Sequence, residues 1–127
     1  MQLHSSIKDV LEFIVNNNGT KIAFKNASLA DLFRVVVDAI KFKALYITHD
    51  GVSINGVAVC RPHYEIKRLH IVGILTTQRV AFPLLMKNIL NDFPQKLGWT
   101  LTGMRGKKGK IIEYTRLNRG KRLLKIS

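Results

Sequence analysis

Few residues in this 127-residue chain have the types and spacing of a metal site. Cys60 and His63 form a Cys-x-x-His pair, and His70 follows seven residues later, so these three side chains could bind zinc. No fourth ligand follows at a suitable spacing. Two histidines seven residues apart in one extended segment are also expected on opposite faces. We therefore predict structural roles for all three, and neither a metal nor a cofactor.

The residues that carry enzyme chemistry are also sparse. The second half of the chain holds three acidic side chains, Glu65, Asp92 and Glu113, which lie 27 and 21 residues apart. Only tertiary folding could pair two of them for acid–base work. The Gly-rich segment 106–110 has neither the spacing nor the Ser or Thr of a P-loop. We predict no enzyme and no small-molecule substrate; a metal-independent nuclease using Tyr114 or His63 stays open as an alternative.

Positive charge is the dominant feature of the composition, and it is concentrated. Twenty-one Lys and Arg against eight Asp and Glu give a net charge of +13. Residues 1–60 have a net charge of +1, whereas residues 61–127 have fifteen basic and three acidic side chains, a net charge of +12. Such a concentration favours binding to a polyanion, because binding releases the polyanion's counterions. Nucleic acid is therefore the first partner to consider.

Composition also bounds the class of protein. An apolar content of 46% and a charged content of 23% are typical of a folded globular chain. No apolar run of 18 residues and no basic amphipathic helix with an aromatic face occur, so we expect no membrane partner. The first residues lack the features of a signal or transit peptide. The single cysteine cannot form an internal disulfide, which fits a reducing compartment.

The elements that must position the charge differ between the two halves. The first sixty residues predict α-β-α-β-β, with helices over 5–16 and 28–41 and a strand over 20–24. Asp50-Gly51 is a hairpin signal between the two strands that follow. Of the aromatic side chains in helices and strands, Phe24, Phe33 and Phe82 are expected in the core.

The second half is expected to be rich in strands, with one helix over 83–93. Arg61-Pro62 is expected to separate two strands, and a third strand, 99–103, leads into a cationic glycine-rich loop. Tyr64 and Trp99 could stack on bases, although burial is the stronger expectation for Trp99. We predict an α+β fold, in which an N-terminal lobe of residues 1–60 packs on a β-rich C-terminal lobe of residues 61–127.

Several segments resemble one family. Residues 66–73, IKRLHIVG, resemble the stretch Ile-x-Arg-Val-Ser-Arg/Lys-Pro-Gly of the small-subunit ribosomal protein called S-eight. Residues 101–106, LTGMRG, are similar to that family's Leu-Ser-Thr-Ser-Lys-Gly, and Gly120 falls on a Gly of its closing Gly-Gly-Glu. The order of helices and strands is also the family's, so the resemblance spans the whole chain.

The resemblance implies a structural protein of the small ribosomal subunit. It implies binding to the central domain of small-subunit rRNA, mostly through the C-terminal lobe, with other small-subunit ribosomal proteins as neighbours. The charge distribution independently indicates the same lobe. The residues that we expect to bind RNA lie in the matched motifs, the cationic loop and the closing segment: Arg68, His70, Thr102, Gly103, Met104, Arg105, Gly106, Lys107, Lys108, Lys110, Arg119 and Lys121.

This chain also departs from the family. Gly103 and Met104 stand where the family has Thr and Ser, so two hydroxyl groups that could contact RNA are lost. Phe13 and Val15 replace basic residues of the first helix, and Lys121 replaces the Glu of the closing motif. Such divergence favours a ribosome of the mitochondrial matrix; the bacterial cytoplasm and the plastid are alternatives.

Two other classes of function remain open. A winged-helix DNA-binding protein would use the helix 83–93 and a cationic wing over 99–116. That helix has only Lys87 as a basic side chain and is apolar on most sides, which suits a core better than a DNA groove. A protein-interaction module would leave the net charge of +12 unexplained.

Overall fold

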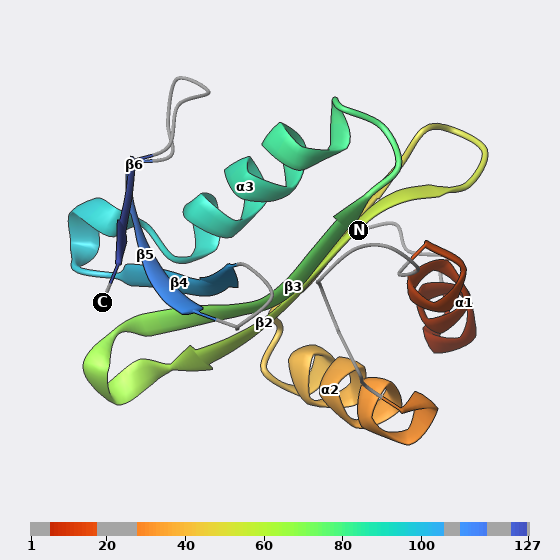
Figure 1. Ribbon diagram of the computed structural model, residues 1–127, viewed down its shortest axis with the longest axis horizontal. Helices are drawn as coiled ribbons and strands as arrows, with labels where there is room; N and C mark the ends of the chain where they lie inside the picture. The colour runs from red at the N-terminus through yellow and green to blue at the C-terminus, as the bar shows by residue number, and fades with distance from the viewer. Residues whose placement is uncertain (1–5, 18–27, 106–109, 117–122, 127) are drawn as a thin grey trace.

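The computed structural model is a mixed α+β fold of helices on both faces of one sheet (Figure 1), which confirms the predicted fold class. It describes residues 6–17, 28–105, 110–116 and 123–126. The helices and strands of these residues are α1 (Ile7–Asn17), α2 (Leu29–Lys41), β1 (Leu45–His49), β2 (Ile54–His63), β3 (Arg68–Thr76), α3 (Ala81–Asp92), β4 (Thr100–Arg105), β5 (Lys110–Arg116) and β6 (Leu123–Ile126).

The six described strands follow one another across the sheet in chain order, β1 to β6. All neighbours pair antiparallel except β3 and β4, which are parallel. A parallel pair needs a crossover connection, and α3 supplies it. The connection carries the chain over one face of the sheet and returns it for β4.

Each face of the sheet has its own hydrophobic core. One core joins α1 and α2 to Val57, Val59 and Leu75, and the other joins α3 to residues that include Leu69 and Leu101. Figure 1 shows α1 and α2 on one side of the long β2–β3 ribbon and α3 on the other. The middle of β2 is therefore buried on both faces, and the sheet is held rigidly there.

Local sequence sets where the helices begin. Ser6 and Asp9 exchange side-chain to backbone hydrogen bonds of 3.2 Å at the start of α1, and Ser28 and Asp31 form the same capping box on α2. In α3, Pro83 lies in the first turn, where its missing N–H costs no helical hydrogen bond. The strand expected over 20–24 lies outside the described residues.

The expected break at Arg61-Pro62 is wrong, because β2 continues through both residues to His63. The Cys60 N–H donates to the Ala44 carbonyl on the β1 side of β2, so the nitrogen of Pro62, two residues on, faces that same edge. β1 pairs with β2 only as far as Val59, so the proline removes no β1–β2 ladder bond. A short 3₁₀ turn, Tyr64–Ile66, then reverses the chain, and one sheet continues across residue 60.

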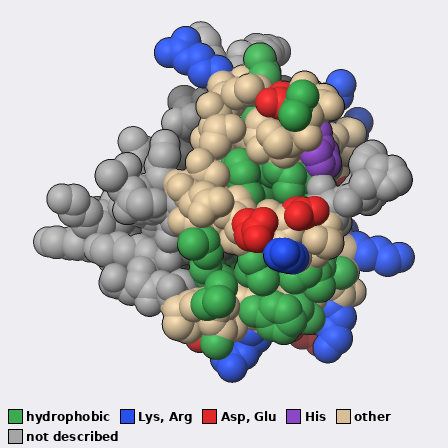
Figure 2. Space-filling model, turned by 90° about the vertical axis from the view of Figure 1, so that its right-hand side faces the viewer, with side chains coloured by type: hydrophobic (Ala, Val, Ile, Leu, Met, Phe, Trp, Pro, Cys, Tyr) green, Lys and Arg blue, Asp and Glu red, His purple; other side chains and the backbone are tan. Residues whose placement is uncertain are grey.

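The core position expected for Phe33 is also wrong, because 49% of this residue is exposed. α2 turns Leu32, Val36 and Ala39 towards the sheet, so Phe33 falls beside this stripe. Hydrophobic side chains gather on the outer face of α1 and α2 in Figure 2, and Phe33 and Leu29 belong to this exposed set.

Candidate nucleic-acid interface

A cluster of basic side chains lies at the end of the β2–β3 hairpin. Arg61 pairs with His70, and His63 pairs with Arg68. Paired residues and residues two apart on one strand share a face, so all four lie on the same face of the sheet. The expectation that His63 and His70 face opposite ways is therefore wrong, because the turn at Tyr64–Ile66 places them on separate strands.

The first residues of β4 extend this face. Arg68 pairs with Thr100, and His70 pairs with Thr102. The Nδ1 atom of His70 lies 3.0 Å from the Thr102 hydroxyl oxygen. The structure thus brings together Arg68, His70 and Thr102 from the residues expected to bind RNA. We use the name cationic sheet face for the set Arg61, His63, Arg68, His70, Thr100 and Thr102.

No described helix covers this face, and α3 supports it from behind. α1 and α2 cover the same face only farther along the hairpin, at Val57 and Val59. On the opposite face, Leu69 and Leu101 are fully buried beneath α3. The side chains of Arg61, His63 and Arg68 are exposed, so they are available to a ligand on a rigid platform.

The charges of the cationic sheet face repel one another. Partial burial lowers the pKa of His70 below its ordinary value, and the positive charges of Arg61, His63 and Arg68 lower it further. Among the described residues, Arg61, His63 and Arg68 form no ion pair that would offset this repulsion. An anion on this face would relieve it, and a phosphate group provides that charge.

An aromatic cluster lies on the other side of the sheet, next to the core beneath α3. The rings of Tyr64 and Trp99 meet edge to face with centroids 5.6 Å apart, and those of Trp99 and Phe93 are 4.7 Å apart. Trp99 is partly buried against the α3 core, as expected. Tyr64 is 55% exposed, and its ring contacts with Phe93 and Trp99 place it on the α3 side of the sheet, opposite the cationic sheet face.

The remaining predicted residues lie farther along the chain. Gly103, Met104 and Arg105 continue β4, where Arg105 pairs with Lys110 of β5. β4 and β5 are therefore neighbouring antiparallel strands. The members of the predicted set that lie outside the described residues are Gly106, Lys107, Lys108, Arg119 and Lys121.

Arg61 and His63 were absent from the predicted set, and the reason is the expected break at Arg61-Pro62. Once β2 runs through this dipeptide, alternation places Arg61 and His63 on one face. The exposed ends of a long antiparallel hairpin are thus the signal that could have identified them. Their pairing with His70 and Arg68 still required the register.

The structure separates Cys60 from the two histidines that were considered with it as zinc ligands. Cys60 is 2% exposed and belongs to the core beneath α3, so it lies on the opposite face from His63 and His70. Burial raises the pKa of its thiol to about 12. No three Cys, His, Asp or Glu residues of the described part lie close enough together to hold a metal ion. None of the described helices is long and apolar enough to cross a membrane.

No protein-family model, curated protein or solved structure matches this chain. The geometry of the cationic sheet face and the sequence resemblance are therefore the two observations that bear on function.

Proposed function

We propose that this chain is a structural RNA-binding protein of the small ribosomal subunit, similar to the S-eight family, and that its cationic sheet face contacts rRNA. The observation that carries the proposal is the joining of Arg68, His70 and Thr102 on one rigid face. Arg61 adds a positive charge to the same face, and the imidazole of His63 lies beside it. The resemblance and the charge distribution are the second line of support.

The chemistry of the face suits RNA backbone recognition. The guanidinium groups of Arg61 and Arg68 can each donate two parallel hydrogen bonds to a phosphate. The Thr102 hydroxyl can serve a phosphate or a ribose 2′-hydroxyl, as donor or acceptor. Contacts of this kind position an RNA helix and read its shape more than its sequence.

The packing of α3 favours RNA over the DNA-binding alternative. Leu85, Met86 and Ile89 of this helix are buried against the sheet. The exposed side of α3 offers Lys87 as its one basic residue, beside the uncharged Asn88 and Asn91. A recognition helix needs several basic groups that reach phosphates, and α3 has only Lys87.

Reversing two charges tests the role of the face. We expect Arg61→Glu together with Arg68→Glu to weaken binding to a folded fragment of small-subunit rRNA by at least about tenfold. The slope of log affinity against log salt should fall by about 1 to 2, because each lost phosphate contact releases one counterion fewer. Filter binding at several salt concentrations measures both quantities.

The matched control reverses two basic side chains outside the face, Lys8→Glu together with Arg34→Glu. Both are exposed on the helices α1 and α2, so the net charge changes equally while the face stays intact. The control should lose much less affinity than the test variant. Equal losses would show that RNA binding depends on net charge alone, and the site proposal would fail.

The compartment and the neighbouring proteins belong to the same proposal. A mitochondrial small subunit, with other ribosomal proteins around the chain, fits the divergence of its motifs. Sedimentation of a tagged chain tests this directly: it should travel with mitochondrial small subunits and leave them when the rRNA is digested. If the chain from a mitochondrial lysate with undigested rRNA sedimented as a free protein, the proposal would be contradicted.

A further inference from the structure

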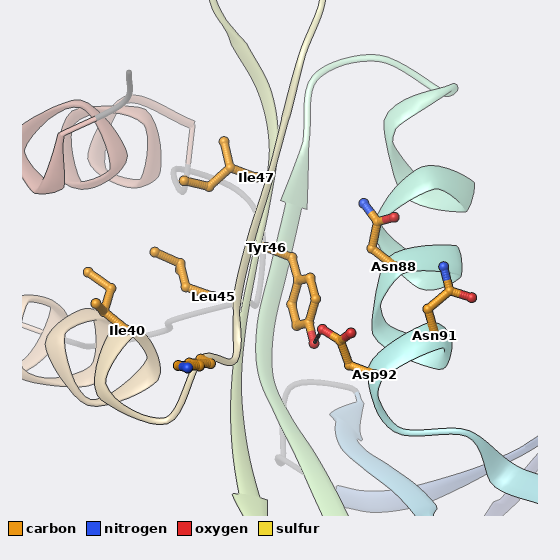
Figure 3. A pocket seen from close by; sticks show the side chains of 8 residues that line it. Ile40, Leu45, Tyr46, Ile47, Asn88, Asn91 and Asp92 are labelled. Carbon is orange, nitrogen blue, oxygen red and sulfur yellow. Dashed lines mark hydrogen bonds between the residues drawn. The ribbon is translucent and has the colours of Figure 1, made fainter. Parts of the chain in front are cut away.

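The outer edge of β1 borders a groove that the proposed RNA contact does not use. Within the described residues, β2 is the only strand that pairs with β1, and no other described strand lies along the opposite edge of β1. The groove has a volume of about 540 Å³ and lies between α2 and α3 (Figure 3). It is thus a hollow along a sheet edge.

The backbone of β1 determines what kind of ligand this groove can take. The Cys60 N–H donates to the Ala44 carbonyl at 3.1 Å, so this carbonyl and, by alternation, the backbone groups of Tyr46 are directed towards β2. Leu45 and Ile47 then direct their N–H and C=O groups away from β2, into the groove. An extended peptide matches this alternating row of donors and acceptors.

The two walls of the groove differ in polarity. Ile40, Leu45 and Ile47 form the apolar wall on the α2 side, and Figure 3 shows their side chains on that side of the sheet. Asn88, Asn91 and Asp92 of α3 form the polar wall opposite. Successive side chains of an added strand would meet these two walls in turn, because their directions alternate.

Charge distinguishes the walls further. The Asp92 carboxylate accepts a hydrogen bond of 2.7 Å from the Tyr46 hydroxyl, which leaves it with further capacity to accept. Burial and this carboxylate both raise the pKa of Tyr46, so the tyrosine stays a neutral donor. Lys43 lies at the α2 side of the groove. A basic side chain is therefore favoured beside α3 and disfavoured beside α2.

We propose that the β1 edge binds an extended segment of a partner protein, with apolar side chains facing α2 alternating with basic side chains facing α3. A second copy of this chain fits less well. If β1 itself were the added strand, its α3-facing positions would be Tyr46 and Thr48, which offer no positive charge to Asp92. The proposal concerns a surface separate from the cationic sheet face, so either can fail alone.

A synthetic peptide with these properties tests the proposal. The probe is a seven-residue peptide with blocked ends in which Lys alternates with Val, titrated into the full chain and followed by NMR. We expect saturable binding that shifts the Leu45 and Ile47 amide resonances and slows their hydrogen exchange. Methylating the two peptide nitrogens that face β1 should weaken binding by about tenfold, because their N–H donors are lost.

A substitution then tests the charge on the polar wall. Asp92→Asn should weaken binding of the alternating peptide several-fold and reduce its salt dependence, because the negative charge facing the lysines is removed. Glu12→Gln, an equal loss of charge on α1, should leave the affinity unchanged. Equal binding by the methylated and unmethylated peptides would overturn the proposal. So would Leu45 and Ile47 amides that are already protected from exchange without peptide, or a dimer of the free chain that protects them.

Discussion

The reactivity of Cys60 reports how completely the core beneath α3 is shielded from solvent. Burial removes the thiol from solvent and raises its pKa to about 12, which leaves almost no reactive thiolate at pH 8. We expect iodoacetamide to modify the folded chain at least roughly 1000-fold more slowly than the chain in denaturant. Mass spectrometry of timed samples measures both rates. Similar rates in the two states would contradict the burial of this residue.

His70 gives the fold a pH dependence of known sign. Burial, and then the charges of Arg61, His63 and Arg68, hold its folded pKa below the ordinary value of 6.5. Between these two pKa values the unfolded chain binds more protons, so this contribution to stability is complete above pH 6.5 and is lost as pH falls through the folded pKa.

Urea unfolding at pH 7.5 and at pH 5.5 measures that effect. We expect His70→Gln to lose less stability over this interval than the parent chain, because the titrating group is gone. Val52→Ala, which removes no titratable group and lies at a position 93% exposed in the β1–β2 hairpin, should keep the full difference. If His70→Gln shows the parent's pH dependence unchanged, His70 is not its source.

The residues of the cationic sheet face show which parts of the candidate site could be predicted from the sequence. Arg68, His70 and Thr102 were predicted from their places in matched motifs, and the register makes His70 and Thr102 cross-strand neighbours. Arg61 and His63 were missed, because proline was expected to end the strand. Pairing is a long-range property, and local residue preferences carry no information about it.

At the scale of elements, the β1–β2 hairpin packs closely against α3 at Gly56. A Cβ atom on Gly56 would lie 2.5 Å from the Thr48 hydroxyl oxygen and 3.0 Å from the Ala81 Cβ. Thr48 cannot move freely, because its hydroxyl donates to Asn55 at 2.7 Å in a buried hydrogen bond. Gly56 is thus required by the space between sheet and helix.

Substitution of this glycine should be costly. We expect Gly56→Ala to lower the free energy of unfolding by about 1–3 kcal/mol, the usual cost of overpacking a core. Chemical denaturation followed by circular dichroism measures the change. Val52→Ala, at a position 93% exposed in the same hairpin, should change stability by less than about 0.5 kcal/mol. Equal effects from both substitutions would show that α3 does not pack closely here.

Most elements were predictable because their signals are local. The periodicity of the helices and the capping serines agree with α1 and α2, and the turn at Asp50-Gly51 lies between β1 and β2. Two expectations failed for nonlocal reasons. Pro62 is tolerated because the pairing of β1 with β2 reaches only as far as Val59. Phe33 is exposed because only the neighbouring stripe of α2 packs against the sheet.

At the scale of the whole molecule, different parts of the sheet serve stability and the proposed RNA binding. Its middle is buried on both sides by helices and holds the fold together. Its far end extends beyond α1 and α2 and presents basic side chains, with α3 supporting it from behind. The sequence showed that the second half carries a net charge of +12. The structure adds that part of this charge lies on a single rigid face.

Competition between RNA and DNA tests the central claim most directly. The full chain would be bound to a folded fragment of the central domain of small-subunit rRNA at near-physiological salt, and duplex DNA of equal charge would be added as competitor. We predict that the DNA displaces the RNA only at about tenfold excess or more, because the DNA lacks the 2′-hydroxyls and the A-form shape. Equal affinity for the two nucleic acids would contradict the proposed ribosomal function.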